Sequence, residues 1–358
     1  RSVAVTGVQT CALPICVVYN HEFVFEDAYI GAIAIEKTGK PLPDQTLNLC
    51  RNTDCILFGA IGDPIYDNNP TAKVRPEQGL LKLRKELGLY ANIRPIKAYP
   101  HLMSSSPIKK EVLDGTDFVV YRELNGGLYF GKKTTNETET YASDLCEYNE
   151  SEIAKITHLA FKAAQARRKK VTLVDKANVL ETSRLWRRVV AEIATDYPDV
   201  ELNFLYVDNA AMQIILNPRQ FDVLLTDNLF GDILSDEASV ISGSIGLMAS
   251  ASIGDYHSLF EPIHGCYTEA KDKNIANPIA SILSVAMLLE HFGLFEEAKK
   301  VIAAVEAAIS NQVVTVDLKV DSRFGTNEVG DFIANHIMDA EDLYFKKDFV
   351  QIGRSTIV

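Results

Sequence analysis

Two aspartates four residues apart follow a short apolar run in the second half of the chain. The apolar run at 221–225 predicts a buried strand, and a polar turn leads from it to Asp232 and Asp236. On a helix these two residues lie about 40° apart on one face, so their carboxylates can hold one hard cation. A solvated acidic turn favoured by the helix dipole is the competing interpretation, and the pair alone does not decide.

Further polar side chains stand at the ends of other predicted strands and loops. They are Arg94, Arg122, Tyr129, Lys176 and Asp208. Ligands of α/β proteins bind beyond the carboxyl ends of strands, where such side chains meet. Arginines, a lysine, a tyrosine and aspartates together predict a pocket for a polyanionic small molecule that is bound with a divalent metal.

The segment 77–87 predicts a helix that stops at Gly88. On this helix Leu80, Leu81 and Arg84 project within about 100° of one another, which places an apolar pair beside a cation. The arrangement suits a ligand with one apolar arm and a carboxylate. The alternative is that both leucines face the core.

Composition and charge narrow the class of protein. The chain has 358 residues, 47% of them hydrophobic, and a net charge of -12, which argues against nucleic-acid binding. Apolar runs are too short to span a membrane. Six cysteines without metal-binding spacing predict reduced thiols and a cytoplasmic location.

Short apolar runs alternate with amphipathic segments from residue 17 onward, which predicts a layered α/β protein. No two glycines are separated by a single residue, so the glycine fingerprint of the Rossmann fold is absent. Residues 1–16 fit no structural element. They resemble translated sequencing adapter and predict an artefactual segment in place of the true N-terminus; a divergent first strand is the alternative.

Several motifs, in this order, resemble the isocitrate/isopropylmalate dehydrogenase family of metal-dependent decarboxylating dehydrogenases. They are RPEQGLL at 75–81, ANIRP at 91–95, RELNGGLYFG at 122–131, DKANV at 175–179, YVD at 206–208, NLFGDILSD at 228–236, His264 with Gly265, and IANP at 275–278. The resemblance runs from about residue 22 to 331 and is strongest to members that act on 3-isopropylmalate. It implies a two-lobed α/β fold with a mixed sheet, distinct from the Rossmann fold.

The implied activity is NAD-dependent oxidative decarboxylation of 3-isopropylmalate to 2-oxoisocaproate in leucine biosynthesis, with Mg²⁺ or Mn²⁺. Alternatives are a relative acting on D-malate, tartrate, homoisocitrate or isocitrate, or a non-catalytic member of the fold, because the family's first strand and glycine turn are missing. Leu80 and Leu81 disfavour substrates with a third carboxylate. A metal-dependent hydrolase built on the aspartates is a weaker alternative.

The resemblance also implies a role for each site residue. Arg84, Arg94 and Arg122 would bind the substrate carboxylates, and Leu80, Leu81 and Val179 would surround the isopropyl group. Asp208, Asp232 and Asp236 would hold the metal, and Tyr129 and Lys176 would be the acid–base pair. Glu77 would lie near the nicotinamide, and His264, Gly265, Glu269 and Asn277 near the adenosine.

Family members are homodimers in which Lys176 and Asp208 reach the site from the partner subunit, so a homodimer with a shared site is implied. Glu269 stands where the family ordinarily has an aspartate, and a carboxylate there favours NAD over NADP. The predicted domains are residues 17–89 with 243–358, on the cofactor side, and a central domain at 90–242 that carries the dimer interface.

Overall fold

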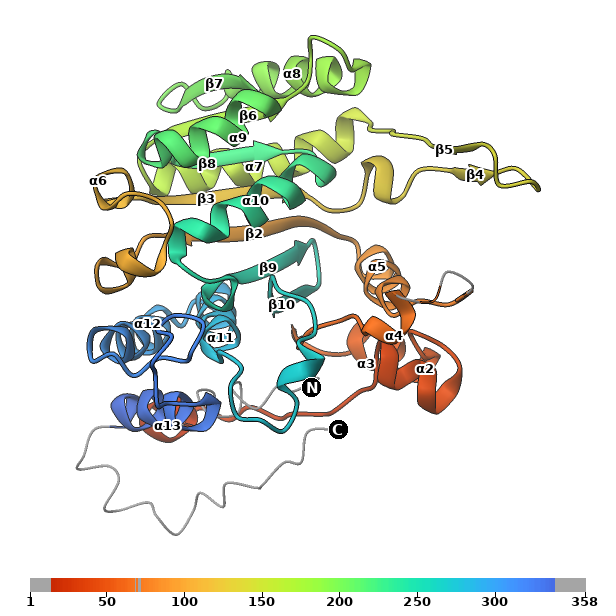
Figure 1. Ribbon diagram of the computed structural model, residues 1–358. Helices are drawn as coiled ribbons and strands as arrows, with labels where there is room; N and C mark the ends of the chain where they lie inside the picture. Colours follow the sequence, from red (N-terminus) through yellow and green to blue (C-terminus); the bar gives the residue numbers. More distant parts are fainter. Residues whose placement is uncertain (1–13, 68, 70–71, 339–358) are drawn as a thin grey trace. The chain divides into compact units, whose positions relative to one another are not determined.

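The computed structural model describes residues 14–67, 69 and 72–338, which form two compact units (Figure 1). Unit 1 combines the chain up to Leu83 with Ser244–Ala251 and the residues from Ser258 onward. Unit 2 combines Arg84–Gly243 with Ser252–His257. The domain division drawn from the sequence stays a prediction. The first 13 residues of the suspected artefactual segment lie outside the described residues, and residues 14–19 are helical.

A mixed sheet with the strand order β9-β2-β3-β8-β6-β7 runs through unit 2. Strand β2 is antiparallel to β3, whereas β3, β8, β6 and β7 are mutually parallel. The expected α/β fold with a mixed sheet is therefore confirmed. The strands are β2 (Leu89–Lys97), β3 (Asp117–Glu123), β6 (Lys170–Asp175), β7 (Glu201–Tyr206), β8 (Val223–Thr226) and β9 (Ala249–Gly254), the last of which passes from unit 1 into unit 2.

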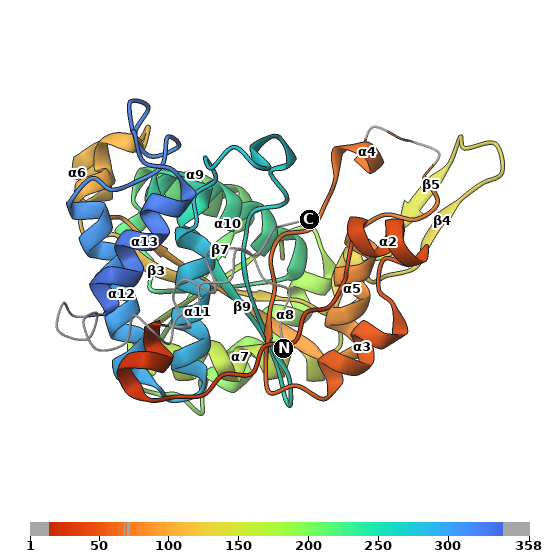
Figure 2. The ribbon, with the colours of Figure 1, turned by 90° about the horizontal axis from the view of Figure 1, so that it is seen from below.

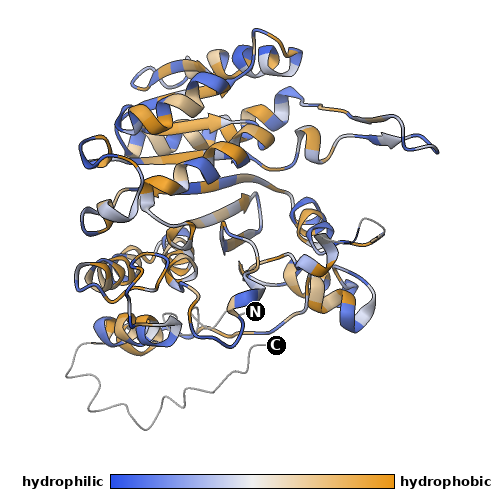
Figure 3. Ribbon diagram, in the orientation of Figure 1, coloured by the Kyte–Doolittle hydropathy of each residue, from blue (hydrophilic) through white to orange (hydrophobic). Residues whose placement is uncertain are grey.

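Helices cover this sheet. Helices α7 (Glu150–Ala166) and α8 (Glu181–Ala194) pack against each other and against one set of alternating strand residues, which includes Val119, Val171 and Val223. Helices α9 (Val207–Leu216) and α10 (Asn228–Ser242) pack against each other, and α10 also packs on β2, β3 and β8. Strands β3 and β8 are hydrophobic along much of their length (Figure 3).

Helix α7 begins at Glu150, because Asn149 caps it and forms a capping box with Glu152. Asp208 was expected at the end of a strand, but β7 ends at Tyr206 and Asp208 lies in the first turn of α9. The smaller elements of unit 2 are η1 (Pro100–Ser105), α6 (Lys110–Leu113), η2 (Gly127–Tyr129), η3 (Pro218–Gln220) and the hairpin of β4 (Lys133–Thr135) with β5 (Ala142–Asp144).

Unit 1 contains a short parallel strand pair and a group of helices. Strand β1 (Ile56–Leu57) pairs in parallel with β10 (Ser258–Pro262). Helices α11 (Ile279–His291), α12 (Phe295–Ser310) and α13 (Thr326–Ile337) lie side by side (Figure 2). Helix α11 follows Pro278, as expected, and is largely buried. The other elements are α2 (Ala32–Thr38), α3 (Asp44–Arg51), α4 (Pro64–Asp67), α5 (Glu77–Glu86), which crosses into unit 2, η4 (Ile245–Leu247) and η5 (Thr268–Ala270).

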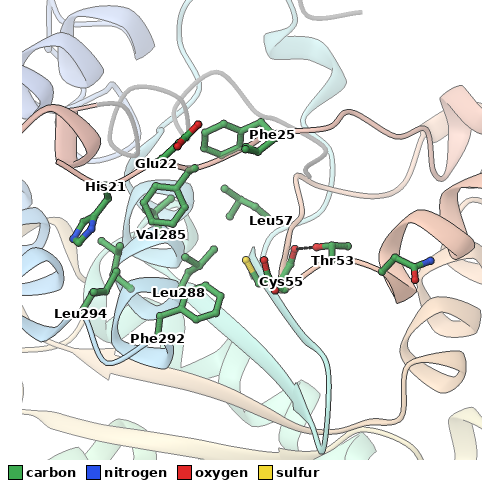
Figure 4. Close-up of a pocket in the computed structure, with 15 residues that line it drawn as sticks. His21, Glu22, Phe25, Thr53, Cys55, Leu57, Val285, Leu288, Phe292 and Leu294 are labelled. Carbon is green, nitrogen blue, oxygen red and sulfur yellow. Dashed lines mark hydrogen bonds between the residues drawn. The ribbon is translucent and has the colours of Figure 1, made fainter. Parts of the chain in front are cut away.

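A cavity of about 600 Å³ lies beside β1 in unit 1 (Figure 4). Its walls come from the segment 21–25, from residues 52–55 and 57, and from the α11 side chains Val285, Leu288 and Leu289. Leu57 is 3% exposed, so β1 is buried at this position. In the part of the chain that the structure describes, no helix is long and apolar enough to cross a bilayer.

Candidate active site

Strand register and helix periodicity bring the predicted polar residues of unit 2 to one face of its sheet. On the antiparallel pair β2 and β3, Asn92 lies opposite Arg122, and Arg94 lies two residues further along the same face. Helix α10 packs on this face and turns its own polar residues toward the arginines. They are Asn228, Asp232, Ser235 and Asp236.

Close approach of α10 to β3 depends on Gly231. A Cβ at this position would lie 2.7 Å from Cβ and Cγ of Arg122 and 2.6 Å from Oγ1 of Thr226. These contacts are too short for any side chain. The glycine therefore sets how near the helix lies to the arginine, and thus places Asp232 within its reach.

Asp232 is the centre of the cluster. Its carboxylate accepts hydrogen bonds from Arg122 Nη1, from Arg94 Nη2 at 3.3 Å and from the Tyr129 hydroxyl at 2.6 Å. Burial favours the protonated form of Asp232, but the charges of Arg122 and Arg94 outweigh it and lower the pKa. The carboxylate is thus ionised at neutral pH.

Both arginines are buried, Arg94 to 5% and Arg122 to 2% exposure. Burial and the neighbouring charge of Arg94 lower the pKa of Arg122 to about 10, while Asp232 opposes this shift. Arg122 still carries its positive charge at neutral pH. Two buried cations side by side form a site for a dianion.

The Tyr129 hydroxyl is held as a proton donor. Burial raises its pKa to about 12, and its hydrogen bond to Asp232 acts in the same direction. Tyr129 lies in the 3₁₀ turn η2, and the hairpin of β4 and β5 follows a few residues later.

Asp236 lies one turn after Asp232 on α10, and its Oδ1 is 3.4 Å from Arg94 Nη1. Burial raises the pKa of Asp236. Two carboxylates on one helix face supply the hard oxygen ligands that Mg²⁺ and Mn²⁺ prefer, and they fit part of such a site. Among residues 14–67, 69 and 72–338, no three His, Cys, Asp or Glu side chains come together to hold a metal ion.

Lys176 and Asp208 form a separate pair. Lys176 follows β6, and its Nζ lies 2.8 Å from Asp208 Oδ2 on α9. The hydrogen bond from Lys176 lowers the pKa of Asp208. Among the described residues, no hydrogen bond or ion pair joins Lys176 or Asp208 to Asp232, so one chain brings together only some of the predicted site residues.

The residues predicted to surround an apolar arm differ in exposure. On α5, Leu80 is 7% exposed, Leu81 is half-buried and Arg84 is 8% exposed. Core packing, the alternative interpretation, thus applies more to Leu80 than to Leu81. Val179, which follows β6, is 62% exposed.

The predicted cofactor residues lie in unit 1. The Glu77 carboxylate is 3.3 Å from the Cβ position of Gly62, and Gly265 approaches the Ile61 carbonyl equally closely. His264 Nδ1 lies 3.0 Å from the Gly265 carbonyl, and Glu269 is exposed in η5.

Asn277, the last of the four predicted adenosine contacts, directly precedes Pro278, the N-cap of α11. Its amide donates to Asp317 at 3.0 Å, and its Oδ1 accepts from the Ile279 backbone N–H at 3.0 Å. Of the residues predicted to bind the cofactor, Glu77 and Gly265 both adjoin the segment after β1, at Gly62 and Ile61 respectively.

Comparisons with known proteins identify the family. The isocitrate/isopropylmalate dehydrogenase family matches residues 15–333. The chain belongs to this family. It is 48% identical over 340 residues to a 3-isopropylmalate dehydrogenase of Bacteroides fragilis, covering 94% of this chain and 96% of that protein. It is 50% identical over 316 residues to the Bacillus subtilis 3-isopropylmalate dehydrogenase, covering 87% and 86%.

Solved structures agree on the fold of this isocitrate/isopropylmalate dehydrogenase family member. An isocitrate dehydrogenase of Methylococcus capsulatus is 35% identical with a TM-score of 0.83, covering 93% of this chain and 96% of the other. A β-decarboxylating dehydrogenase of Thermococcus kodakarensis is 33% identical with a TM-score of 0.73, covering 96% and 95%.

Sequence reasoning missed several polar residues that support the cluster in this family member. Asn228, Asn92 and Ser235 contact the two arginines, and all three are buried. Buried Glu123 accepts the backbone N–H groups of Asn125 and Gly126. For Asn228 the available signal was its place one residue after the N-cap Asp227, directly beyond β8.

Proposed function

We propose that this protein oxidises and decarboxylates 3-isopropylmalate with NAD and a divalent metal, and produces 2-oxoisocaproate for leucine biosynthesis. The observation that carries the proposal is the convergence of Arg94, Arg122 and Tyr129 on Asp232, with Asp236 on the next turn. Identity of 48–50% to 3-isopropylmalate dehydrogenases over most of the chain supports it.

Arg94 and Arg122, with Arg84, bind the two substrate carboxylates. Arg122 pairs with Asp232, and Arg94 lies within ion-pair distance of Asp232 and Asp236, so nearby negative charge favours the charged form of both arginines. A bound dianion then completes the charge balance of this buried site. Leu81, with Leu80 and Val179, contacts the isopropyl group.

Tyr129 and Lys176 move the protons of the reaction. Lys176 would take the proton of the substrate hydroxyl when the alcohol is oxidised, NAD would supply the hydride acceptor, and the β-keto acid would then lose CO₂. Tyr129 protonates the carbon that carried the lost carboxylate. The pKa of about 12 keeps the Tyr129 hydroxyl protonated until that step.

Asp232 and Asp236, with Asp208 as a third carboxylate, would hold Mg²⁺ or Mn²⁺. When bound, such a metal would supply a Lewis acid for the alcohol oxygen and for the negative charge that develops as CO₂ leaves. The residues that would contact NAD are Glu77, His264, Gly265, Glu269 and Asn277. The exposed Glu269 carboxylate accepts from the ribose hydroxyls and repels a 2′-phosphate.

Lys176 and Asp208 reach the site from a second copy of the chain. An exposed apolar surface on unit 2 supports a homodimer of this kind. It consists of Met212, Leu216 and Ile233, which are 56%, 65% and 57% exposed. Ile233 directly follows Asp232, and Met212 and Leu216 share α9 with Asp208, which supports an interface that would include both halves of the site.

A relative acting on isocitrate is the second candidate, because the Methylococcus capsulatus structure is an isocitrate dehydrogenase. Leu80 and Leu81 disfavour it, since a third carboxylate calls for a polar partner. We place the reaction in the cytoplasm, because the five described cysteines are free thiols; they are Cys16, Cys50, Cys55, Cys146 and Cys266.

NADH formation tests the activity. Purified protein with Mn²⁺ and NAD should oxidise 3-isopropylmalate far faster than isocitrate or D-malate, and NADP should replace NAD poorly. Preference for isocitrate would establish the second candidate. Absence of turnover with all three substrates, in folded protein, would refute the proposal.

Mixing two inactive variants tests the shared site. Lys176→Ala and Asp232→Asn should each be inactive, and dissociating and reassociating an equimolar mixture should restore about a quarter of wild-type activity, because half of the dimers would hold one intact site. A mixture as inactive as its components, although hybrid dimers form, would place both residues in one subunit's site.

A further inference from the structure

Two buried asparagines accept hydrogen bonds from the two arginines of the cluster. Asn228 Oδ1 accepts from Arg122 Nε at 3.1 Å and from Nη2 at 2.7 Å. Asn92 Oδ1 accepts from Arg94 Nε at 2.6 Å. Both asparagines are 0% exposed.

The second polar group of each amide is bound to a different part of unit 2. Asn228 Nδ2 donates to the Gly126 carbonyl at 3.2 Å, and Asn92 Nδ2 donates to Ser252 Oγ at 3.1 Å. Each asparagine therefore needs one acceptor and one donor. Aspartate has the same shape but lacks the donor, and it would add a negative charge beside the arginine.

A neutral acceptor fixes a guanidinium without neutralising it. An Arg122 that was paired on both sides with carboxylates would be less able to attract an anionic substrate, because the added charge would offset its field. We propose that Asn228 and Asn92 are positioning residues, which orient Arg122 and Arg94 and preserve their positive charge for the substrate carboxylates. This inference rests on the proposed function, in which the arginines bind those carboxylates.

Asn228 also contacts the backbone next to Tyr129, the proposed acid. Gly126, whose carbonyl it holds, directly precedes η2, which contains Tyr129. The one side chain therefore fixes the guanidinium of Arg122 and the start of the turn that carries the phenol. Loss of the amide donor should disturb Tyr129, whereas loss of the acceptor should disturb Arg122.

Three variants separate positioning from simple structural support. Asn228→Asp is isosteric and should disturb the shape of the core least, whereas Asn228→Ala removes the amide. Tyr148→Phe is the matched control. It removes the hydroxyl that accepts from the Asn228 backbone N–H at 3.0 Å, but leaves the Asn228 side chain and Arg122 in place.

The measurements are KM and kcat for 3-isopropylmalate, equilibrium binding of D-malate by calorimetry, and Tm. Asn228→Asp should raise KM by about a hundredfold and Asn228→Ala by about tenfold, with D-malate affinity falling in the same order. Asn92→Asp should behave like Asn228→Asp. Tyr148→Phe should lower Tm but change KM less than about twofold.

The order of the two Asn228 variants decides the outcome. If Asn228→Asp binds as tightly as wild type and Asn228→Ala is the weaker binder, the amide serves shape alone and the inference is wrong. Wild-type protein that binds D-malate but oxidises none of the substrates would refute the proposed function, while the binding order would still test the asparagines. Wild-type protein that binds no dicarboxylate would overturn both.

Discussion

The cluster around Asp232 in unit 2 and the cavity beside β1 in unit 1 are stabilised differently. In the cluster, Arg94, Arg122 and Tyr129 all bind one carboxylate, and the neutral amides of two asparagines accept hydrogen bonds from the arginines. Beside β1, a cavity of about 600 Å³ is lined by aliphatic and aromatic side chains and also by polar residues of the segments 21–22 and 52–54. Buried polar contacts dominate the first region, whereas the second contains unfilled space with a mixed apolar and polar lining.

The contrast implies different consequences of substitution. A buried charge left without its partner costs several kcal/mol, and the same change removes chemistry. A cavity costs stability through missing contacts, and none of the residues assigned to the reaction lines this one. Changes in the cluster should therefore abolish activity, whereas changes at the flank should alter stability first.

The largest expected effect is that of Asp232→Asn. The variant loses a metal ligand and the counter-charge of two buried arginines, so kcat/KM should fall about 10⁴-fold, or ~5 kcal/mol. Steady-state kinetics with Mn²⁺ and a urea titration measure activity and stability. Asp236→Asn is the control: Asp236 is more exposed, so stability should change less while activity is also lost. Activity within tenfold of wild type would contradict the central place of Asp232.

Filling the cavity beside β1 should give the next largest effect. We expect that replacing residues 1–16 by a Val/Ile-rich strand and a glycine turn raises the free energy of unfolding by about 4 kcal/mol, because two large aliphatic side chains become buried. The cavity wall includes the segment 22–25 and Leu57 of β1. Among the described strands, β1 stands at the end of the strand order, next to β10, so its other edge is open to pairing with an added strand.

Urea unfolding measures this change. The same replacement with alternate residues of the strand changed to Ser is the matched control, since it keeps the length but removes the apolar side chains. Equal stability of the two replacements would show that apolar filling is not what the flank lacks. If the replacement raised activity as well as stability, packing at the flank of β1 would also limit function, and the two regions would differ less than we propose.

The two regions also differ in how far the sequence predicted them. The strand ends and the spacing of Asp232 and Asp236 identified the cluster, because periods of 2 and 3.6 fix which residues share a face. The inward turn of Asn228 and Glu123 was not predictable, since the same residue types normally cap helices or face water. Likewise, the sequence shows that a segment such as 22–25 is largely apolar, but it does not show whether a neighbouring strand covers that segment.

Glu123 gives a pH-dependent test within the polar region. Burial raises its pKa to about 7, although the Asn125 and Gly126 backbone N–H groups oppose this. The folded protein therefore binds the proton more tightly than the unfolded chain, so the free energy of unfolding falls as pH rises from 4.5 to about 7. We expect a loss of about 2 to 3 kcal/mol, which Glu123→Gln abolishes.

Urea titrations of both proteins at several pH values check this expectation. Glutamine carries no charge at any of these pH values, so the stability of the variant should change little between pH 4.5 and 7. Its amide nitrogen cannot accept from one of the two backbone N–H groups that Glu123 binds, so the variant should be the less stable protein near pH 4.5. Parallel pH curves for the two proteins would show that Glu123 is not the group responsible.

The smallest expected effect concerns Leu81, which is half-buried, beside Leu80, which is 7% exposed. Leu81→Ala should lower kcat/KM for 3-isopropylmalate about tenfold and leave that for D-malate, which lacks the apolar arm, nearly unchanged. Leu80→Ala should also lower the free energy of unfolding by about 2 kcal/mol, because its side chain is part of the core. If Leu81→Ala lowered kcat/KM equally for both substrates, Leu81 would serve packing. Helix α5 would then contribute to stability and not to recognition of the apolar arm of the substrate.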